Sequence, residues 1–225
     1  MDLNYFLELG INGALAGLMY ALVAMGVVLV YKSSSVPNLA QGALTMVGAY
    51  VVLFYAIGLS LPMWLAIPLA ILTMCLLGLG IERVALRPLA GRPIVMILMM
   101  TLGLDIFLRA LTLSIWGGNG RPMRIGISDE PLFMGPLLLN RAYVIGAVVT
   151  LILFGLFVFF FQTRRGVVLR AIADDYMASW SVGISVERGV GLSWALSSMV
   201  ATVAGVLWAS MQGVDQSLSM LLLKG

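Results

Sequence analysis

The stretch LGINGALAGLMYALVAMGVVLVY, residues 9–31, carries no charged residue over a length that crosses a bilayer. A membrane-spanning helix needs about 20 predominantly apolar residues, because the hydrocarbon core of a bilayer is about 30 Å thick. Lipid offers no hydrogen-bond partner, so a spanning segment must pair its own backbone groups. This run therefore predicts a transmembrane helix.

Comparable apolar runs recur along the chain. They predict six spans in all, at about residues 9–31, 39–58, 63–81, 94–116, 143–161 and 190–211. Of all residues, 61% are hydrophobic and 10% are charged, whereas soluble domains carry roughly 25% charged residues. No linker divides the chain, so we predict one domain over residues 1–225, an all-α polytopic transmembrane helix bundle. The acidic Asp2 and Glu8 argue against a cleaved signal peptide.

The distribution of Lys and Arg predicts the orientation of the bundle, because these residues concentrate in loops that stay cytoplasmic. One set of alternating loops carries eight of them and the other set carries three. The first set is Lys32, Arg83, Arg87, Arg92, Arg164, Arg165, Arg170 and Arg188, and the second is Arg121, Arg124 and Arg141. The N-terminus is thus predicted outside and residues 163–188 inside. Because the basic residues are scattered among loops, we expect no nucleic-acid partner.

Polar side chains enter two of the predicted spans. Asn38 and Gln41 follow Pro37 at the start of the second span, where a buried amide is costly unless it is paired. They are predicted either to line a translocation pathway or to hydrogen-bond another helix. Asp105 and Arg109 lie four residues apart on one face of the fourth span and can neutralise each other. We expect a structural ion pair, with proton or ion coupling as the alternative.

Small residues recur every four positions in the first and the sixth span. Such stripes let helix backbones approach closely, which drives helix association in lipid. We expect both stripes to face protein, the alternative being that small residues are merely frequent in membrane helices. The stripes are Gly13, Gly17 and Ala21, and Ala201, Gly205 and Ala209.

The connection at residues 117–141 is rich in Gly and Pro and carries both signs of charge. It is predicted to lie on the extracytoplasmic side as a cap over the bundle. A docking surface for an extracytoplasmic partner is the alternative.

The segment GVVLRAIADDYMASWSVGI, residues 166–184, combines charge with apolar bulk. On a helix, one side carries Leu169, Ile172, Tyr176 and Trp180. The opposite side carries Arg170, Asp174, Asp175, Ala178 and Ser181. This pattern predicts an amphipathic helix of about four turns that seats its apolar side on the bundle. Anionic lipid surfaces attract basic helices, so the acidic pair favours a protein partner, and a solvated connecting helix is the alternative.

Three segments resemble the membrane permease subunits of branched-chain amino acid ABC importers. The family's cytoplasmic loop, T-x-x-G-x-x-x-R-A with an acidic or amide pair, an Ala and a Gly-Ile, is matched by Thr163, Gly166, Arg170, Ala171, Asp174, Asp175, Ala178, Gly183 and Ile184. Its Asn-x-Ala-His/Gln-Gly segment, followed by Gly-Ala-Tyr, is matched by Asn38, Ala40, Gln41, Gly42, Gly48, Ala49 and Tyr50. TLGLDIFLRALTLSIWG, residues 101–117, resembles the family's fourth-span pattern. The similarity extends over nearly the whole chain.

The resemblance implies a subunit of an ATP-driven importer for branched-chain or related amino acids, in the inner membrane of a bacterial or archaeal cell. It also implies a second permease subunit, identical or homologous, cytoplasmic ATP-binding subunits and an extracytoplasmic substrate-binding protein. Residues 163–188 then form the coupling segment that docks on the ATPase, through Gly166, Arg170, Ala171, Asp174, Asp175, Ala178 and Gly183. The translocation pathway is assigned to Asn38, Gln41, Gly42 and Thr101.

The chain departs from the family in two respects. Members usually continue with further spans and a Gly-rich segment, so this chain is expected to lack C-terminal spans, and Pro37 stands where an aliphatic residue is more common. No Gly-rich loop ending in Lys-Ser/Thr is present, so another chain must hydrolyse ATP. With no histidine and no nucleophile–base or metal-ligand spacing, we expect neither an enzyme nor a metal or other cofactor. The alternative function is an ATP-independent secondary transporter or channel for a small polar solute.

Overall fold

The computed structural model describes residues 3–123, 132–134 and 137–221. Arg124, used above to predict orientation, lies outside these residues. Within the described ranges, six helices are long and apolar enough to cross a membrane, which confirms the predicted all-α, six-span bundle. The six spans are built on α1 (Leu3–Ser34), α2 (Gln41–Leu53), α3 (Met63–Ile81), α4 (Ile94–Trp116), α5 (Arg141–Gln162) and α8 (Val186–Gln212), and α2 reaches spanning length only with the turn that follows it, as Gln41–Gly58.

Shorter elements extend or connect the spanning helices. The π-helical turn η1 (Phe54–Gly58) continues α2, while the π-helical turn η2 (Glu82–Leu86) and the 3-10 turn η3 (Arg87–Leu89) continue α3. The third span therefore reaches Leu89 rather than the predicted Ile81. Between α5 and α8 lie α6 (Arg164–Asp174) and α7 (Tyr176–Ser181), and η4 (Gln216–Met220) follows α8. The strands β1 (Leu132–Met134) and β2 (Leu137–Leu139) form an antiparallel hairpin.

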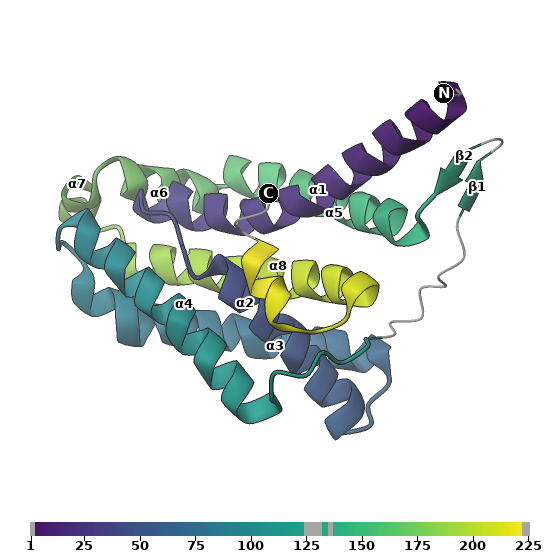
Figure 1. Ribbon diagram of the computed structural model, residues 1–225. Helices are drawn as coiled ribbons and strands as arrows, with labels where there is room; N and C mark the ends of the chain where they lie inside the picture. Colours follow the sequence, from purple (N-terminus) through teal and green to yellow (C-terminus); the bar gives the residue numbers. More distant parts are fainter. Residues whose placement is uncertain (1–2, 124–131, 135–136, 222–225) are drawn as a thin grey trace.

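Helix α8 lies at the centre of the bundle, in contact with α1, α2 and α3, while α5 packs on α1 and α4 on α2 (Figure 1). Helices α6 and α7 lie at one end of the molecule, and the hairpin and the N-terminus lie at the other (Figure 1). We name the first the basic end, because α6 and the turns η2 and η3 place Arg83, Arg87, Arg164, Arg165 and Arg170 there. The opposite end is named the hairpin end.

Contact between α2 and α8 depends on small residues, as predicted for the sixth span. Every residue of α2 is buried. A Cβ atom on Gly205 of α8 would lie 2.2 Å from the carbonyl oxygen of Thr45, and one on Gly48 of α2 would lie 2.7 Å from Cα of Thr202. The two backbones therefore touch, and such proximity maximises van der Waals contact where no hydrophobic driving force exists.

The stripe of small residues in the first span does not face the described residues of this chain, so its contact with protein stays a prediction. Gly13, Gly17 and Ala21 are exposed, and nothing lies within 4 Å of a Cβ built on either glycine. Helix α1 instead contacts its neighbours through larger side chains such as Met19, which is 1% exposed. The space for Met19 comes from Gly146 on α5, where a Cβ would lie 2.8 Å from the Met19 sulfur.

The described parts of the connection 117–141 are tied to the hairpin end. Arg121 pairs with Val214 beyond α8, with N–O distances of 3.0 and 2.8 Å. Asn12 of α1 donates to the carbonyl oxygen of Leu138 at 3.0 Å and accepts from the N–H of Asn140 at 3.1 Å. Residues 124–131 and 135–136 lie outside the described part, so the roles as cap or docking surface stay predictions.

Candidate functional site

The segment predicted as one amphipathic helix folds as two, α6 and α7, with a break at Asp175. This residue has an extended backbone (φ −151°, ψ 106°), and its Oδ1 accepts a hydrogen bond from the N–H of Ala178 at 2.9 Å. The carboxylate thereby pairs a donor that the first turn of a helix otherwise leaves free. Thr163 caps α6 in the same way, accepting from the N–H of Gly166 at 3.4 Å. The prediction of a single helix is wrong because Asp175 begins a new one.

The apolar side of α6 packs on the bundle as predicted, whereas Trp180 does not. Leu169 and Ile172 are 1% and 2% exposed and cluster with Leu29, Phe161 and Val186. Trp180 on α7 is 67% exposed, which contradicts its predicted seating role. The spacing of the apolar residues places them on one side only if the helix is continuous, and the break at Asp175 interrupts it. The side chain of Tyr176 lies outside what the structure describes.

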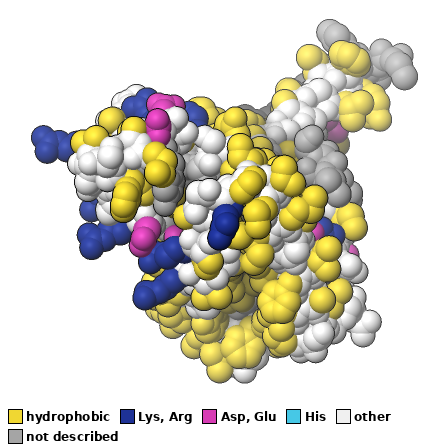
Figure 2. All heavy atoms as spheres, turned by 90° about the vertical axis from the view of Figure 1, so that its left-hand side faces the viewer, with side chains coloured by type: hydrophobic (Ala, Val, Ile, Leu, Met, Phe, Trp, Pro, Cys, Tyr) yellow, Lys and Arg dark blue, Asp and Glu magenta, His cyan; other side chains and the backbone are white. Residues whose placement is uncertain are grey.

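Helices α6 and α7 present a mixed surface at the basic end. We name it the α6–α7 face, formed by the exposed residues Arg170, Asp174, Asp175, Met177, Ala178, Trp180 and Val182. It brings together four of the predicted coupling residues, and a fifth, Gly183, ends α7 with a left-handed backbone (φ 86°). Figure 2, which views this end, shows basic and acidic side chains gathered beside apolar ones. Apolar side chains rimmed by charge are typical of a protein contact.

The two remaining predicted coupling residues hold the segment in place. A Cβ on Gly166 would lie 2.4 Å from Cα of Phe161, so a glycine is needed for α6 to fold back against the end of α5. The carbonyl oxygen of Ala171 accepts a hydrogen bond from the hydroxyl of Ser179 at 2.9 Å. This bond joins α7 to α6 across the break.

A cavity of about 260 Å³ lies at the basic end, between α6 and the bundle. Four spanning segments contribute to its lining, namely those of α1, α3 with its turns η2 and η3, α4 and α8. Thr101, predicted for the translocation pathway, is among the lining residues. Ser35 lines the cavity as well, and its hydroxyl donates to the carbonyl oxygen of Ala173 in α6 at 2.8 Å.

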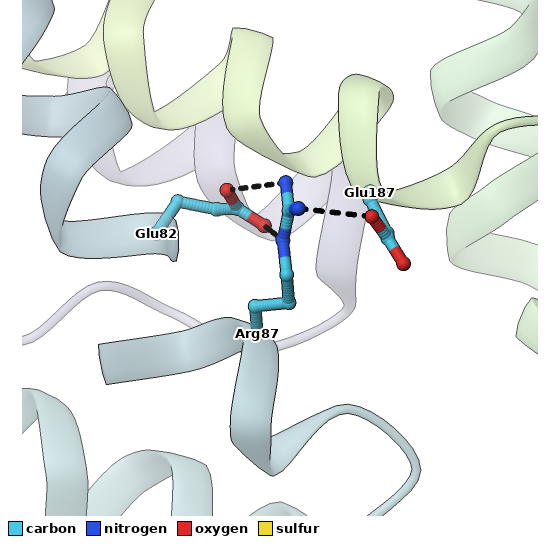
Figure 3. A network of polar contacts seen from close by, with 3 residues as sticks. All are labelled: Glu82, Arg87 and Glu187. Atoms are coloured by element: carbon cyan, nitrogen blue, oxygen red, sulfur yellow. Dashed lines mark hydrogen bonds and ion pairs between the residues drawn. The ribbon is translucent and has the colours of Figure 1, made fainter. Parts of the chain in front are cut away.

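Arg87 bridges two carboxylates at the wall of this cavity, and we name these three residues the Arg87 triad (Figure 3). Its Nε and Nη2 donate to Oε1 and Oε2 of Glu82 at 3.4 and 3.3 Å, and its Nη1 lies 3.0 Å from Oε2 of Glu187. Glu82 is 3% exposed, and a carboxylate so buried requires a paired cation. The side chain of Glu187 is 60% exposed. The triad joins the end of the third span to the start of α8.

Asn38 and Gln41 are completely buried where α1, α2 and α8 meet. The Asn38 amide donates to Oε1 of Gln41 at 3.3 Å, and the Gln41 amide donates to the carbonyl oxygen of Ser197 at 3.4 Å. The hydroxyl of Ser197 lies 2.8 Å from Oε1 of Gln41 and 2.9 Å from the carbonyl oxygen of Gly26. The observed contacts therefore correspond to the helix–helix alternative, and Gly42 is buried beside them. A translocation role stays a prediction.

Asp105 and Arg109 pair within α4, through Oδ2 of Asp105 and Nη2 of Arg109. Asp105 is 5% exposed, and the side chain of Arg109 is 24% exposed. Pairing lowers the cost of placing two charges within a span. Coupling of protons or ions to this pair stays a prediction.

Sequence reasoning missed the Arg87 triad. Glu82 and Arg87 are five residues apart, and such residues do not face each other on an α-helix. The π-helical turn η2 changes that phase and brings them together. An acidic residue at the end of an apolar run was the available signal, whereas the contact with Glu187 is set by tertiary packing.

The chain is similar in sequence to a family of known proteins. Residues 10–223 match the family described as the permease component of branched-chain amino acid transport systems. The chain is 30% identical over 227 residues to the high-affinity branched-chain amino acid transport system permease protein BraD of Pseudomonas aeruginosa, covering 95% of this chain and 74% of that protein. It is 30% identical over 236 residues to the corresponding LivH of Escherichia coli, covering 93% and 72%.

An archaeal relative is similar to the same degree. The probable branched-chain amino acid transport permease protein LivH of Methanocaldococcus jannaschii is 31% identical over 202 residues, covering 86% of this chain and 63% of that protein. No solved structure is significantly similar. The family match includes α2 to α8 entire, and with them the α6–α7 face and the cavity with its triad. The chain therefore belongs to the family of branched-chain amino acid transport permease components.

Proposed function

We propose that this chain is the membrane permease subunit of an ATP-driven importer for branched-chain or related amino acids. Members of the family are described as permease components of transport systems, and the relatives are described as branched-chain amino acid permeases. In this proposal the basic end faces the cytoplasm, in agreement with the excess of Lys and Arg there. Separate ATP-binding subunits hydrolyse ATP and dock on the α6–α7 face.

The exposure of large apolar side chains on α7 and at its C-terminal cap carries the proposal. Met177, Trp180 and Val182 are 66%, 67% and 80% exposed, although they lie outside the spanning helices. Each such side chain loses favourable free energy by remaining in water, on the order of 1.5–3 kcal/mol relative to full burial. A helix that merely connects two spans in solvent would not require exposed apolar side chains. A protein partner that buries it recovers that free energy.

The remaining partners follow from the same proposal. A second permease subunit, identical or homologous, completes the membrane part, and an extracytoplasmic substrate-binding protein docks at the hairpin end. The solute passes along a path that includes Asn38, Gln41, Gly42 and Thr101. The position of Thr101 at the cavity supports this assignment for one of the four.

Copurification and transport test the docking step. The tagged chain is expressed with its ATP-binding subunits as wild type, as Trp180→Ala and as Asp174→Lys. Trp64→Ala serves as the matched control, because Trp64 is 74% exposed at the start of α3, at the hairpin end. Loss of a central aromatic anchor costs an interface about 2 kcal/mol or more, so Trp180→Ala should weaken ATPase binding at least about 30-fold.

ATP-dependent uptake of leucine into proteoliposomes should fall in the same two variants and persist in Trp64→Ala. If Trp180→Ala and Asp174→Lys both keep the ATPase and ATP-dependent uptake, the docking proposal is wrong. Leucine uptake by the chain that proceeds without ATP would instead indicate the alternative, an ATP-independent transporter or channel.

A further inference from the structure

The cavity at the basic end combines two kinds of lining that suit one class of solute. Its wall is largely apolar, with an aliphatic part that includes Val30, Val36, Leu86, Ile97, Ile172 and Val190, while Ser33, Ser34, Ser35 and Thr101 add hydroxyl groups. The charged groups in its lining are those of the Arg87 triad. Binding sites for small solutes are typically apolar with a few convergent polar groups that fix orientation.

The charges of the lining favour a ligand that carries both signs. Two carboxylates and one guanidinium leave an excess negative charge, which attracts a cationic group. Among the described residues that line the cavity, Arg87 is the only cation, and its planar guanidinium suits a carboxylate ligand. Glu187 is the more accessible of the two carboxylates, because its side chain is 60% exposed, whereas Glu82 is buried and accepts from two nitrogens of Arg87. A group that enters the cavity can thus exchange with Glu187 at Arg87 without uncovering Glu82.

We propose that this cavity binds an aliphatic amino acid as its zwitterion, with the carboxylate at Arg87, the ammonium at Glu187 and the side chain against the aliphatic wall. This inference rests on the proposed function. If the chain is an importer permease, the ligand is the transported solute at the cytoplasmic end of its path. Binding replaces the direct contact between Arg87 and Glu187, which joins the end of the third span to α8. Because Ile172 and Ala173 of α6 line the same cavity, occupancy is communicated to the coupling segment.

Equilibrium binding of radiolabelled leucine to the chain in lipid nanodiscs tests the proposal without any ATPase. Glu187→Gln removes the partner of the ammonium group and leaves Arg87 paired with Glu82. A hydrogen bond to a charged group accounts for about 1.5–3 kcal/mol, so this variant should bind leucine roughly 10- to 100-fold more weakly. Glu8→Gln, the same change on α1 near the hairpin end, should bind as the wild type does.

Blocking the cavity provides a second and independent variant. Ala90 is exposed where it lines the cavity, so Ala90→Trp should abolish leucine binding while leaving the bundle folded. Val84→Trp is its control, because Val84 is 79% exposed on the neighbouring turn η2 and does not line the cavity. Arg87→Gln is less informative, since it leaves Glu82 buried without a cation.

Competition identifies which end of the ligand each residue holds. The oxo acid 4-methyl-2-oxopentanoate has the carbon skeleton of leucine but no ammonium group, so it should compete at least about tenfold more weakly than leucine in the wild type. In Glu187→Gln this difference should largely disappear.

The proposal is overturned if the wild type binds no leucine, if Glu187→Gln and Ala90→Trp bind it normally, or if the oxo acid competes as well as leucine. These results are separate from the ATP dependence of uptake. If uptake is driven by ATP but Glu187→Gln binds leucine as the wild type does, this inference alone is refuted. If the wild type binds leucine but its uptake is not driven by ATP, only the proposed function is refuted.

Discussion

Gly205→Ala introduces a methyl group where the backbones of α2 and α8 touch. A Cβ at this position would lie 2.2 Å from the carbonyl oxygen of Thr45, about 1.2 Å short of the 3.4 Å at which ordinary contact begins. The obstructing atom belongs to the backbone of a helix that is buried along its whole length. No change of rotamer can remove the clash, so the two helices must move apart.

The magnitude follows from two opposing effects. Overpacking a close contact costs about 1–3 kcal/mol, and a backbone obstacle places this case at the upper end of the range. Alanine recovers about 1 kcal/mol over glycine in helix propensity. We therefore expect Gly205→Ala to lower the free energy of unfolding by about 2 kcal/mol.

The matched control is Gly17→Ala in α1, where nothing lies within 4 Å of the added Cβ. It has the same gain in helix propensity without the clash, so its free energy of unfolding should rise by up to about 1 kcal/mol. The assay is equilibrium unfolding in mixed micelles with increasing dodecyl sulfate, followed by circular dichroism. Equal free energies of unfolding for the two variants would refute the direct backbone contact between α2 and α8.

Two further predictions concern polar groups. Asp175→Ala removes the cap of α7 and should cost about 0.5–2 kcal/mol locally, seen as faster hydrogen exchange of the Ala178 N–H, whereas Asp174→Ala should leave that exchange unchanged. Arg109→Leu leaves Asp105 buried without its cation and should lower the free energy of unfolding by about 3–5 kcal/mol. The double variant with Asp105→Leu should recover most of this loss in the same unfolding assay, and a double variant as unstable as the single one would contradict the pairing.

The lengths of the apolar runs were sufficient to predict the six spans, because a single chain segment in lipid pairs its own backbone N–H and C=O groups by forming a helix. The end of the third span was not predictable in this way. Glu82 interrupts the apolar run, which suggested an end at Ile81, yet the structure continues to Leu89. It can do so because Arg87, directly after the π-helical turn, neutralises Glu82 at its start. An apolar-run criterion does not detect a pair five residues apart.

Residues 163–188, the predicted coupling segment, illustrate a second limit of periodic patterns. Asp174 and Asp175 both fit the polar side of a continuous helix, so the pattern gave no reason for a break. A side chain of this kind can instead pair with backbone N–H groups and begin a helix, as Asp175 does with Ala178. The sequence does not mark Asp175 as a cap, because the residue three positions later is Ala178 and not the Glu or Gln of a capping box.

The two helices on either side of this break are tied to each other and to the bundle. Helix α7 is joined to α6 by the Ser179 hydroxyl, and α6 is packed so closely on α8 that a Cβ on Gly189 would lie 2.5 Å from Cδ1 of Ile172. The start of α8 carries Glu187, which is paired with Arg87 at the end of the third span. Packed interfaces change between discrete arrangements rather than deforming continuously. If residues 163–188 dock on an ATPase as proposed, we therefore expect a displacement of α7 to move α6 together with the start of α8.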